Sequence, residues 1–294
     1  MYASFKRQEF NAELDWYVFE TNRLHLQPKF KVEHQSETNF ELLSADARMA
    51  EAWSYDNQVV GMHFLFGPQL TYTRTLSGPQ QQFTRFVSGI FQWDLTSHDF
   101  EYFLSSPQSG YQASFALNSN AKELLSDLSI HKLTLSEHKL WNLGNFSPAL
   151  FVLGLRGSFS TSITDTSQNN LDQVPPNFLY YLGGSNSLRG FTRAGIPNRN
   201  QGALTASFLS LELRLAKLLP LFMEPIFFAD IGAVGDKPFT LDKPFYFSPG
   251  FGLRIASPIG VFRGTFAKGI ALAKNNSSTV SDGYQFYLSF GEEF

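Results

Sequence analysis

The stretch Leu209-Ser210-Leu211-Glu212-Leu213-Arg214-Leu215 alternates between leucine and a small or charged residue. Successive side chains of a β-strand point to opposite faces, so the four leucines share one face and Ser210, Glu212 and Arg214 share the other. Residues 284–291 repeat this pattern, with aromatic and aliphatic side chains at every second position. Both stretches therefore predict β-strands with one apolar face and one polar face.

The same alternation recurs along the chain, between turns rich in Gly, Pro, Asn, Ser and Asp. It marks thirteen segments, near residues 5–19, 22–35, 39–54, 58–76, 83–97, 110–118, 127–141, 148–163, 203–216, 222–234, 246–257, 260–271 and 283–293. Short and long connections alternate, as in outer-membrane barrels with short periplasmic turns and longer outer loops. Because a single-chain bacterial barrel has an even number of strands, we expect about 12 strands, with Phe5–Asp56 forming two rather than three.

Composition indicates that these strands cross a membrane. The 294-residue chain contains 31 Phe and 11 Tyr, residues typical of the lipid-facing surface and interfacial girdles of membrane barrels. Its apolar runs are far shorter than the ~18 residues of a membrane-spanning helix. We therefore predict an all-β fold, a transmembrane antiparallel β-barrel that forms a single domain over residues 1–294. The long connection at 164–202 is predicted to be an extracellular loop folded into the lumen.

Other classes of function find little support in the sequence. The net charge of −3 offers no basic surface for nucleic acid, and the lack of cysteine removes disulfides and thiolate metal sites. The six histidines lack metal-ligand spacing. Ser97-His98-Asp99 is a local cluster of catalytic residue types, but neighbouring residues on a strand point in opposite directions. We expect no enzyme activity, no catalytic residue, no metal and no cofactor. No signal peptide follows Met1, so we expect a mature or trimmed chain.

Two motifs resemble a known family. The long connection contains Tyr181-Leu182-Gly183-Gly184-Ser185-Asn186-Ser187-Leu188-Arg189-Gly190-Phe191, and the second strand after it contains Phe228-Ala229-Asp230-Ile231-Gly232. In this order, they resemble the loop and strand signatures of the outer-membrane barrel-assembly and two-partner-secretion superfamily, which includes BamA and TamA. The resemblance covers roughly residues 105–294 and implies a barrel of the bacterial outer membrane whose sixth extracellular loop folds back into the lumen.

The physical chemistry of these residues suggests a latch between loop and barrel. Arg189 is a permanently charged fork of five donors, and it needs carboxylate acceptors wherever water is excluded. Alternation points Asp230 and Glu212 inward, so we predict a contact between Arg189 and Asp230. Small residues would let the loop approach the wall closely. The predicted latch comprises Arg189, Gly190, Phe191, Asp230, Gly232 and Glu212.

The sequence leaves three functions open. Members of the resembled family usually have more strands and carry periplasmic repeat domains, whereas this chain begins almost at once with barrel-like sequence. We therefore place first a non-enzymatic porin-like or scaffolding barrel that self-assembles as a homo-oligomer and associates with outer-membrane lipids. The alternatives are insertion or secretion of client polypeptides through a lateral seam, and a barrel anchor for a missing partner domain. Weak pairing between the first and last strands would favour the seam.

Overall fold

The protein forms a single antiparallel sheet. The structure is a computed structural model, and it describes residues 7–17, 24–37, 40–78, 83–97, 107–164, 171, 174–197, 202–216, 218–220, 223–241, 244–257, 260–272 and 283–290. Thirteen strands within these ranges pair in the order of the sequence, each antiparallel to the next. No helix in these ranges is long and apolar enough to cross a membrane.

The strands follow the predicted alternating segments closely. Their bounds are β1 (Arg7–Glu13), β2 (Leu24–Ser36), β3 (Glu41–Asp56), β4 (Val60–Ser77), β5 (Phe83–Ser97), β6 (Gly110–Asn120), β7 (Ile130–Leu143), β8 (Phe151–Thr164), β9 (Thr205–Leu215), β10 (Met223–Gly235), β11 (Tyr246–Ser257), β12 (Gly260–Ala271) and β13 (Gly283–Phe290). The outermost parts of the first and last predicted segments, 5–6, 18–19 and 291–293, lie outside the described residues.

The expected number of about 12 strands was too low. The segment from Phe5 to Asp56 supplies three strands, β1 to β3, in its described part, rather than two. Alternation is a local property of each strand, whereas the even-number rule applies only to a complete closed barrel. The even-number rule was therefore no reason to reduce the three alternating segments within Phe5–Asp56 to two strands.

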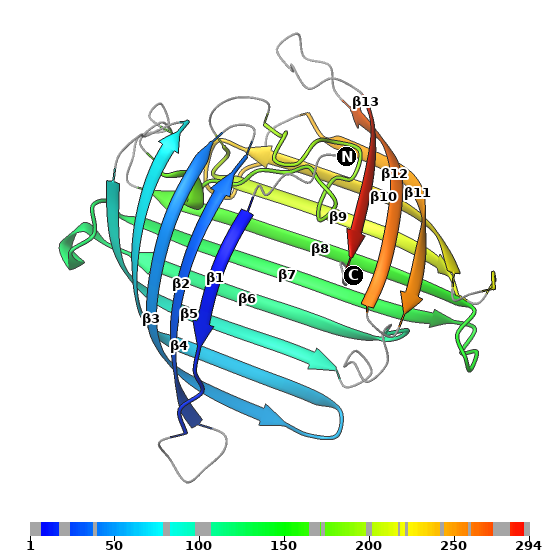
Figure 1. Cartoon of the computed structure of the whole chain (residues 1–294), viewed down its shortest axis with the longest axis horizontal. Coiled ribbons are helices and arrows are strands. Elements are labelled where there is room, and N and C mark those ends of the chain that lie inside the picture. Colours follow the sequence, from blue (N-terminus) through cyan, green and yellow to red (C-terminus); the bar gives the residue numbers. More distant parts are fainter. Residues whose placement is uncertain are drawn as a thin grey trace.

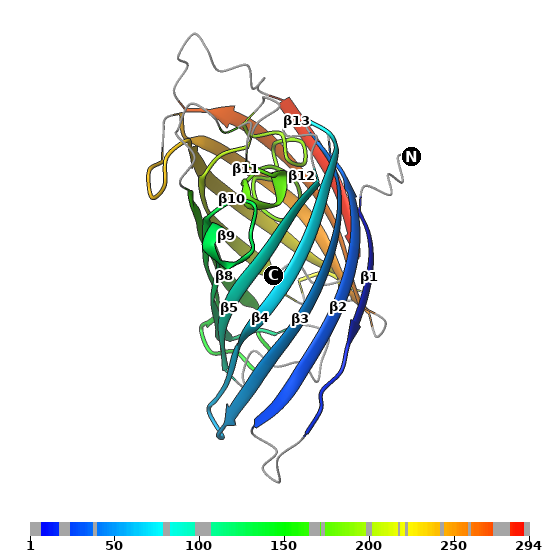
Figure 2. The ribbon, with the colours of Figure 1, turned by 90° about the vertical axis from the view of Figure 1, so that its left-hand side faces the viewer.

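The sheet is strongly curved and presents two different faces (Figures 1 and 2). On β9, Leu209 and Leu211 are exposed on the outer face, whereas Ser210, Glu212 and Arg214 are buried on the concave face. Strand β13 shows the same split, because Tyr284, Phe286, Leu288 and Phe290 are all exposed. An outer surface covered by such side chains suits contact with lipid.

The apolar core lies between the concave face and the long connection from β8 to β9. Side chains of this connection make up most of two buried clusters. In the first cluster, Phe178 packs against Phe86 of β5 with ring centroids 4.6 Å apart. In the second, Leu188 and Ile196 are fully buried. The described part of this connection, residues 171 and 174–197 and 202–204, therefore packs inside the curve of the sheet (Figure 2).

The sheet has two edges, β1 and β13. Strand β1 pairs with β2 and strand β13 pairs with β12, and among the described residues neither edge strand pairs with a second neighbour. Figure 1 shows β1 in blue and β13 in red at these two edges. Within the described ranges, each edge strand is thus part of a ladder on one side only.

A charged substitution tests the assignment of the outer face. Leu211→Arg is expected to destabilise the protein in a bilayer by about 2–4 kcal/mol, because the charge would face hydrocarbon. Urea-induced unfolding in lipid vesicles measures this change. The matched control is Ser136→Arg, which places the same charge on an exposed site of the concave face and is expected to change stability little. Equal effects of the two variants would show that the outer face does not contact lipid.

Candidate functional site

Strands β9 and β10 bring polar side chains together on the concave face. Asp230 of β10 lies directly opposite Ser210 of β9, and Glu212 follows two residues further along β9. All three side chains therefore point to the same face. Ser210 Oγ donates to Asp230 Oδ1 at 2.7 Å, and all three residues are fully buried. Strand alternation and register thus build a buried acidic site.

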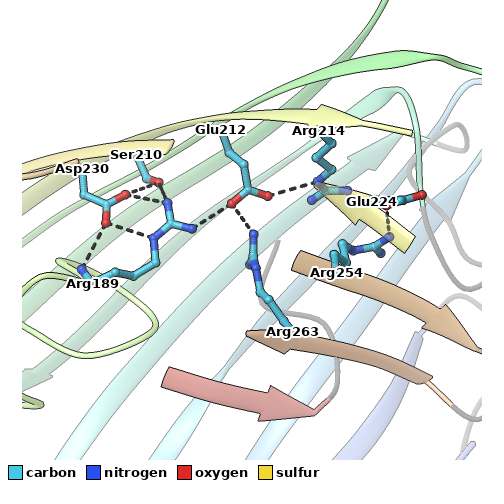
Figure 3. Close-up of polar contacts among 8 residues, drawn as sticks. All are labelled: Arg189, Ser210, Glu212, Arg214, Glu224, Asp230, Arg254 and Arg263. Atoms are coloured by element: carbon cyan, nitrogen blue, oxygen red, sulfur yellow. Dashed lines mark hydrogen bonds and ion pairs between the residues drawn. The ribbon is translucent and has the colours of Figure 1, made fainter. Parts of the chain in front are cut away.

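Arg189 of the long connection occupies this site (Figure 3). Its Nε donates to Asp230 Oδ2 at 3.0 Å and its Nη2 to Asp230 Oδ1 at 2.7 Å, which is a bidentate pair. Nη2 also donates to Ser210 Oγ at 2.9 Å, and Nη1 donates to Glu212 Oε2 at 2.7 Å. The backbone N–H of Arg189 adds a bond of 3.1 Å to Asp230 Oδ2. The guanidinium is thus held by three side chains from two strands.

Burial and charge act in opposite directions on Arg189, whose side chain is only 1% exposed. Burial lowers the pKa of Arg189, but hydrogen bonds to Asp230 and the charges of Asp230 and Glu212 outweigh this and raise the pKa above its ordinary value. The guanidinium also lies 3.4 Å from the centroid of the Phe228 ring, where the π-face favours a cation. Arg189 therefore stays charged at every physiological pH.

Glu212 connects Arg189 to further arginines on neighbouring strands (Figure 3). Its carboxylate accepts from Arg214 Nε at 3.2 Å and from Arg263 Nη2 of β12. Nearby, Arg254 Nη1 of β11 donates to Glu224 Oε2 of β10 at 2.6 Å. In this set four arginines meet three carboxylates, all of them buried. Through Asp230, Glu212 and Arg263 the network links the loop to β9, β10 and β12, while the separate pair of Arg254 and Glu224 joins β11 to β10.

Glycines allow the loop to touch the sheet backbone. A Cβ on Gly190 would overlap the backbone of Lys268 and Gly269 in β12. The backbone N–H of Gly190 donates to Ser248 Oγ of β11. A Cβ on Gly232 would lie 2.9 Å from the carbonyl oxygen of Ser207 and 3.1 Å from Leu182 Cδ1 of the loop. Both glycines therefore occupy points of close approach.

Phe191 continues the contact through apolar packing. Its side chain is buried with Leu182, Leu188 and Ile196, and its ring meets that of Tyr246 edge-on, with centroids 5.5 Å apart. The structure thus brings all six residues of the predicted latch to one region, where β9 and β10 meet the loop.

Several residues of the site were absent from the sequence prediction. Ser210, Phe228 and Ser248 each occupy inward positions of β9, β10 and β11, so alternation already pointed them to the concave face. Their contacts with the loop depend on its path, which no local pattern encodes. Arg263 comes from a strand three places away from β9, and only the register of β9 to β12 brings it to Glu212.

The described residues also bear on a metal site and on the Ser97-His98-Asp99 cluster of the sequence. Within the residues that it describes, no group of three or more His, Asp and Glu side chains is arranged to hold a metal ion. Ser97 ends β5 and its Oγ accepts from the Tyr111 backbone N–H at 2.8 Å. His98 and Asp99 of the sequence cluster lie outside the described residues.

Comparison with known proteins identifies the family. The whole sequence, residues 1–294, matches the Omp85 superfamily domain. The chain belongs to the Omp85 superfamily. It is therefore a non-enzymatic protein of the bacterial outer membrane, as its sequence predicted. Among curated proteins, no sequence matches this Omp85 chain.

Solved structures share the fold of this Omp85 chain. BamA from Haemophilus ducreyi lacking POTRA domains 1-3 matches with a TM-score of 0.71 and 16% identity, over 97% of this chain and 62% of that one. CdiB from Escherichia coli gives 0.63 and 12%, over 96% and 52%, and CdiB from Acinetobacter baumannii gives 0.61 and 10%, over 97% and 50%. The chain thus spans about half to two thirds of the length of these structures.

Removing the guanidinium tests the energetics of the site. Arg189→Ala in this Omp85 chain would leave the buried Asp230 carboxylate without its cation and would remove one of the three arginines that contact Glu212, so we expect a loss of about 3–5 kcal/mol of stability. The loss should appear as a lower unfolding temperature and as faster protease cleavage within residues 174–197. Arg74→Ala, at an exposed site on β4, is the control. Unchanged heat and protease resistance in Arg189→Ala would contradict a stabilising role for the contact.

A second substitution tests close approach without changing charge. Gly190→Ala adds one methyl group against the backbone of Lys268 and Gly269, so the loop must shift or strain, at a cost of about 1–3 kcal/mol. The same protease assay should show cleavage within the loop at a rate between those of wild type and Arg189→Ala. Gly89→Ala is the control, since a Cβ at Gly89 meets nothing within 4 Å. If protease cleaved Gly190→Ala and Gly89→Ala at the same rate, the close approach of Gly190 to β12 would be refuted.

Proposed function

We propose that this Omp85 protein inserts or secretes outer-membrane polypeptides through a seam between β1 and β13. The observation that carries the proposal is the pair of sheet edges, which lack a ladder partner among the described residues. Weak pairing of these two strands is the feature that favours a seam over a porin-like barrel. Family membership also favours this interpretation.

The edges need partners inside a membrane. Water is absent from the hydrocarbon core, so every backbone N–H and C=O there must be bonded, and an open sheet edge is not tolerated in contact with lipid. We therefore propose that β1 and β13 meet in the resting state; as the first and last of thirteen antiparallel strands they run in the same direction, so their pairing would be parallel and slightly less stable than an antiparallel one. A client polypeptide in extended conformation could satisfy the same groups by adding a strand to either edge. Closure and client binding would thus use the same hydrogen-bonding groups.

The outer faces of both edge strands suit a client that enters the bilayer. Phe10 of β1 is 63% exposed, and on β13 Leu288 is 77% exposed. A strand added beside them would continue an apolar outer surface while its alternate residues faced inward. The expected clients are therefore polypeptides with the same period-2 alternation as this chain, which are outer-membrane barrel proteins themselves.

The loop contacts support a role in holding the barrel rather than in passing solutes. We propose that residues 164–202 occupy the lumen and that Arg189, with Gly190, Phe191, Asp230, Gly232 and Glu212, latches them there. A packed loop narrows the interior, which makes a porin-like role less suitable. Neither the contacts nor the comparisons support self-assembly as a homo-oligomer. An anchor for a partner domain is compatible with a chain that spans only part of its structural matches.

Site-specific cross-linking tests the seam. A photo-reactive phenylalanine analogue replaces Phe10 in β1, Phe286 in β13 or, as the control, Phe227 in β10, which is 52% exposed on the same outer face but far from either edge. The probe is a denatured eight-stranded outer-membrane barrel protein added to vesicles that contain the full chain. We expect the probe to cross-link at positions 10 and 286. We also expect it to insert faster into vesicles that contain the full chain than into empty vesicles. Equal cross-linking at all three positions, or no gain in insertion, would refute the seam.

A further inference from the structure

Two residues of the loop contact opposite ends of the strand order. The Phe191 carbonyl oxygen accepts from Tyr287 Oη of β13 at 2.7 Å. Two residues later, Arg193 donates through Nε and Nη2 to Glu37 Oε1, both at 2.8 Å. Glu37 directly follows β2, the strand that pairs with edge strand β1. Residues 191–193 thus join the last strand to the second strand from inside the sheet.

From these contacts we infer that residues 191–193 form a strap across the seam. The strap holds the β2 end and β13 together, and the seam opens when Arg193 separates from Glu37. This inference rests on the proposed function for its biological meaning, because it names the contact that controls opening of the proposed seam. The contact itself can be tested without any client.

The two ends of the strap are held unequally. On the side of β9 to β13, the strap follows directly from Arg189, whose side chain is 1% exposed, and Phe191 is buried in the apolar cluster. On the side of β2, the Arg193 side chain is 47% exposed. Water thus reaches the Arg193 end of this ion pair, although it does not reach the Glu37 carboxylate. The strap should therefore part at Glu37 and remain attached to Arg189.

Arg193 contacts only one of the two carboxylate oxygens of Glu37 in the described structure. The Glu37 side chain is fully buried, and Nε and Nη2 of Arg193 both contact the same oxygen, Oε1. Gln35 Nε2 donates to Oε1 as well, at 3.2 Å. The other oxygen, Oε2, is buried and has no hydrogen-bond partner within the part of the chain that the structure describes. A buried carboxylate favours a cation strongly, so separation of Arg193 from Glu37 requires that water reach the carboxylate.

The surroundings of this ion pair leave room for movement. A cavity of about 470 Å³ lies beside it, lined by Gln35, Glu37 and Phe40 on the side of β2 and by residues 179–187 and Arg193 on the side of the loop. The rings of Phe40 and Tyr181 also meet beside the cavity, with centroids 5.1 Å apart. The ion pair of Arg193 with Glu37 and this ring contact thus both border the cavity.

Distance measurements between the two edges test the strap. The chain has no cysteine, so Phe10→Cys and Leu288→Cys place one spin label on each edge, and pulsed electron paramagnetic resonance gives the distance between them in client-free vesicles. Arg193→Gln and Glu37→Gln are each expected to shift the distribution to longer distances. The reversed pair Glu37→Arg with Arg193→Glu is expected to recover the wild-type distribution.

Matched controls separate the strap from general loss of structure. Glu33→Gln removes a carboxylate from β2, the strand that Glu37 follows, where Glu33 pairs with Lys31 at 2.6 Å. This variant should leave the distance between the two spin labels unchanged. Arg193→Lys keeps the charge and should resemble wild type. Wild-type distances in both Arg193→Gln and Glu37→Gln would overturn the strap. A shift in Glu33→Gln as large as in Glu37→Gln would overturn it as well.

Failure of the strap and failure of the proposed function give different results. If Arg193→Gln lengthens the edge distance but the barrel probe never inserts through the wild-type protein, the strap stands and the insertion function is refuted. If the probe inserts and cross-links at both edges while Arg193→Gln leaves the edge distance unchanged, the function stands and the strap is refuted. With both intact, Arg193→Gln should also change the rate of probe insertion.

Discussion

A buried guanidinium is the constraint on which the rest of this structure depends. Arg189 is removed from water, and a buried charge without partners would be prohibitively unfavourable. The loop can therefore lie against the sheet only where Asp230 and Glu212 present carboxylates at the right spacing. This requirement also fixes the register of β10 against β9, because a slip of one residue would turn Asp230 to the lipid side. One loop residue thus restricts the loop path, the strand register and the choice of neighbouring side chains.

The distribution of apolar residues follows from the membrane. In a water-soluble protein, a continuous outer surface of Leu and Phe would be a large aggregation-prone patch. In an outer-membrane protein that surface contacts lipid, and the compact apolar core must be built elsewhere. Here it lies between the loop and the concave face, where Phe86 and Phe178 meet. The loop thus replaces the second layer that a soluble sheet protein would need.

Much of the fold could be predicted from sequence because alternation is local. Each of the thirteen alternating segments contains a strand, and β9 shows why, since Leu209 to Leu215 repeat with a period of two. The total number of strands was less predictable, because the even-number rule for closed barrels led to an expectation of about 12 strands. At the site, Arg189, Asp230 and Glu212 were predicted from the resemblance and from the inward alternation.

The remaining contacts depend on three-dimensional features that the sequence does not display. Arg263 reaches Glu212 because the pairing of four strands brings them together, and Glu37 reaches Arg193 because the sheet curves back towards its own beginning. No short window of sequence contains both members of either pair. Membership of the Omp85 superfamily defines the class of protein. The individual contacts depend on how distant parts of the chain come together in the fold.

The position of the loop in the chain has a consequence for the order of folding. Phe191 is separated by 96 residues from Tyr287, and Arg193 by 156 residues from Glu37. Contacts between such distant residues must overcome a large loss of chain entropy, and proteins dominated by them fold slowly. Strand β2 is synthesised before the loop, so its contact must wait until residue 193 exists, and the β13 contact must wait until residue 287 exists. During that interval the exposed apolar strands are vulnerable to aggregation, so this chain should depend on chaperones that bind it before it reaches the membrane.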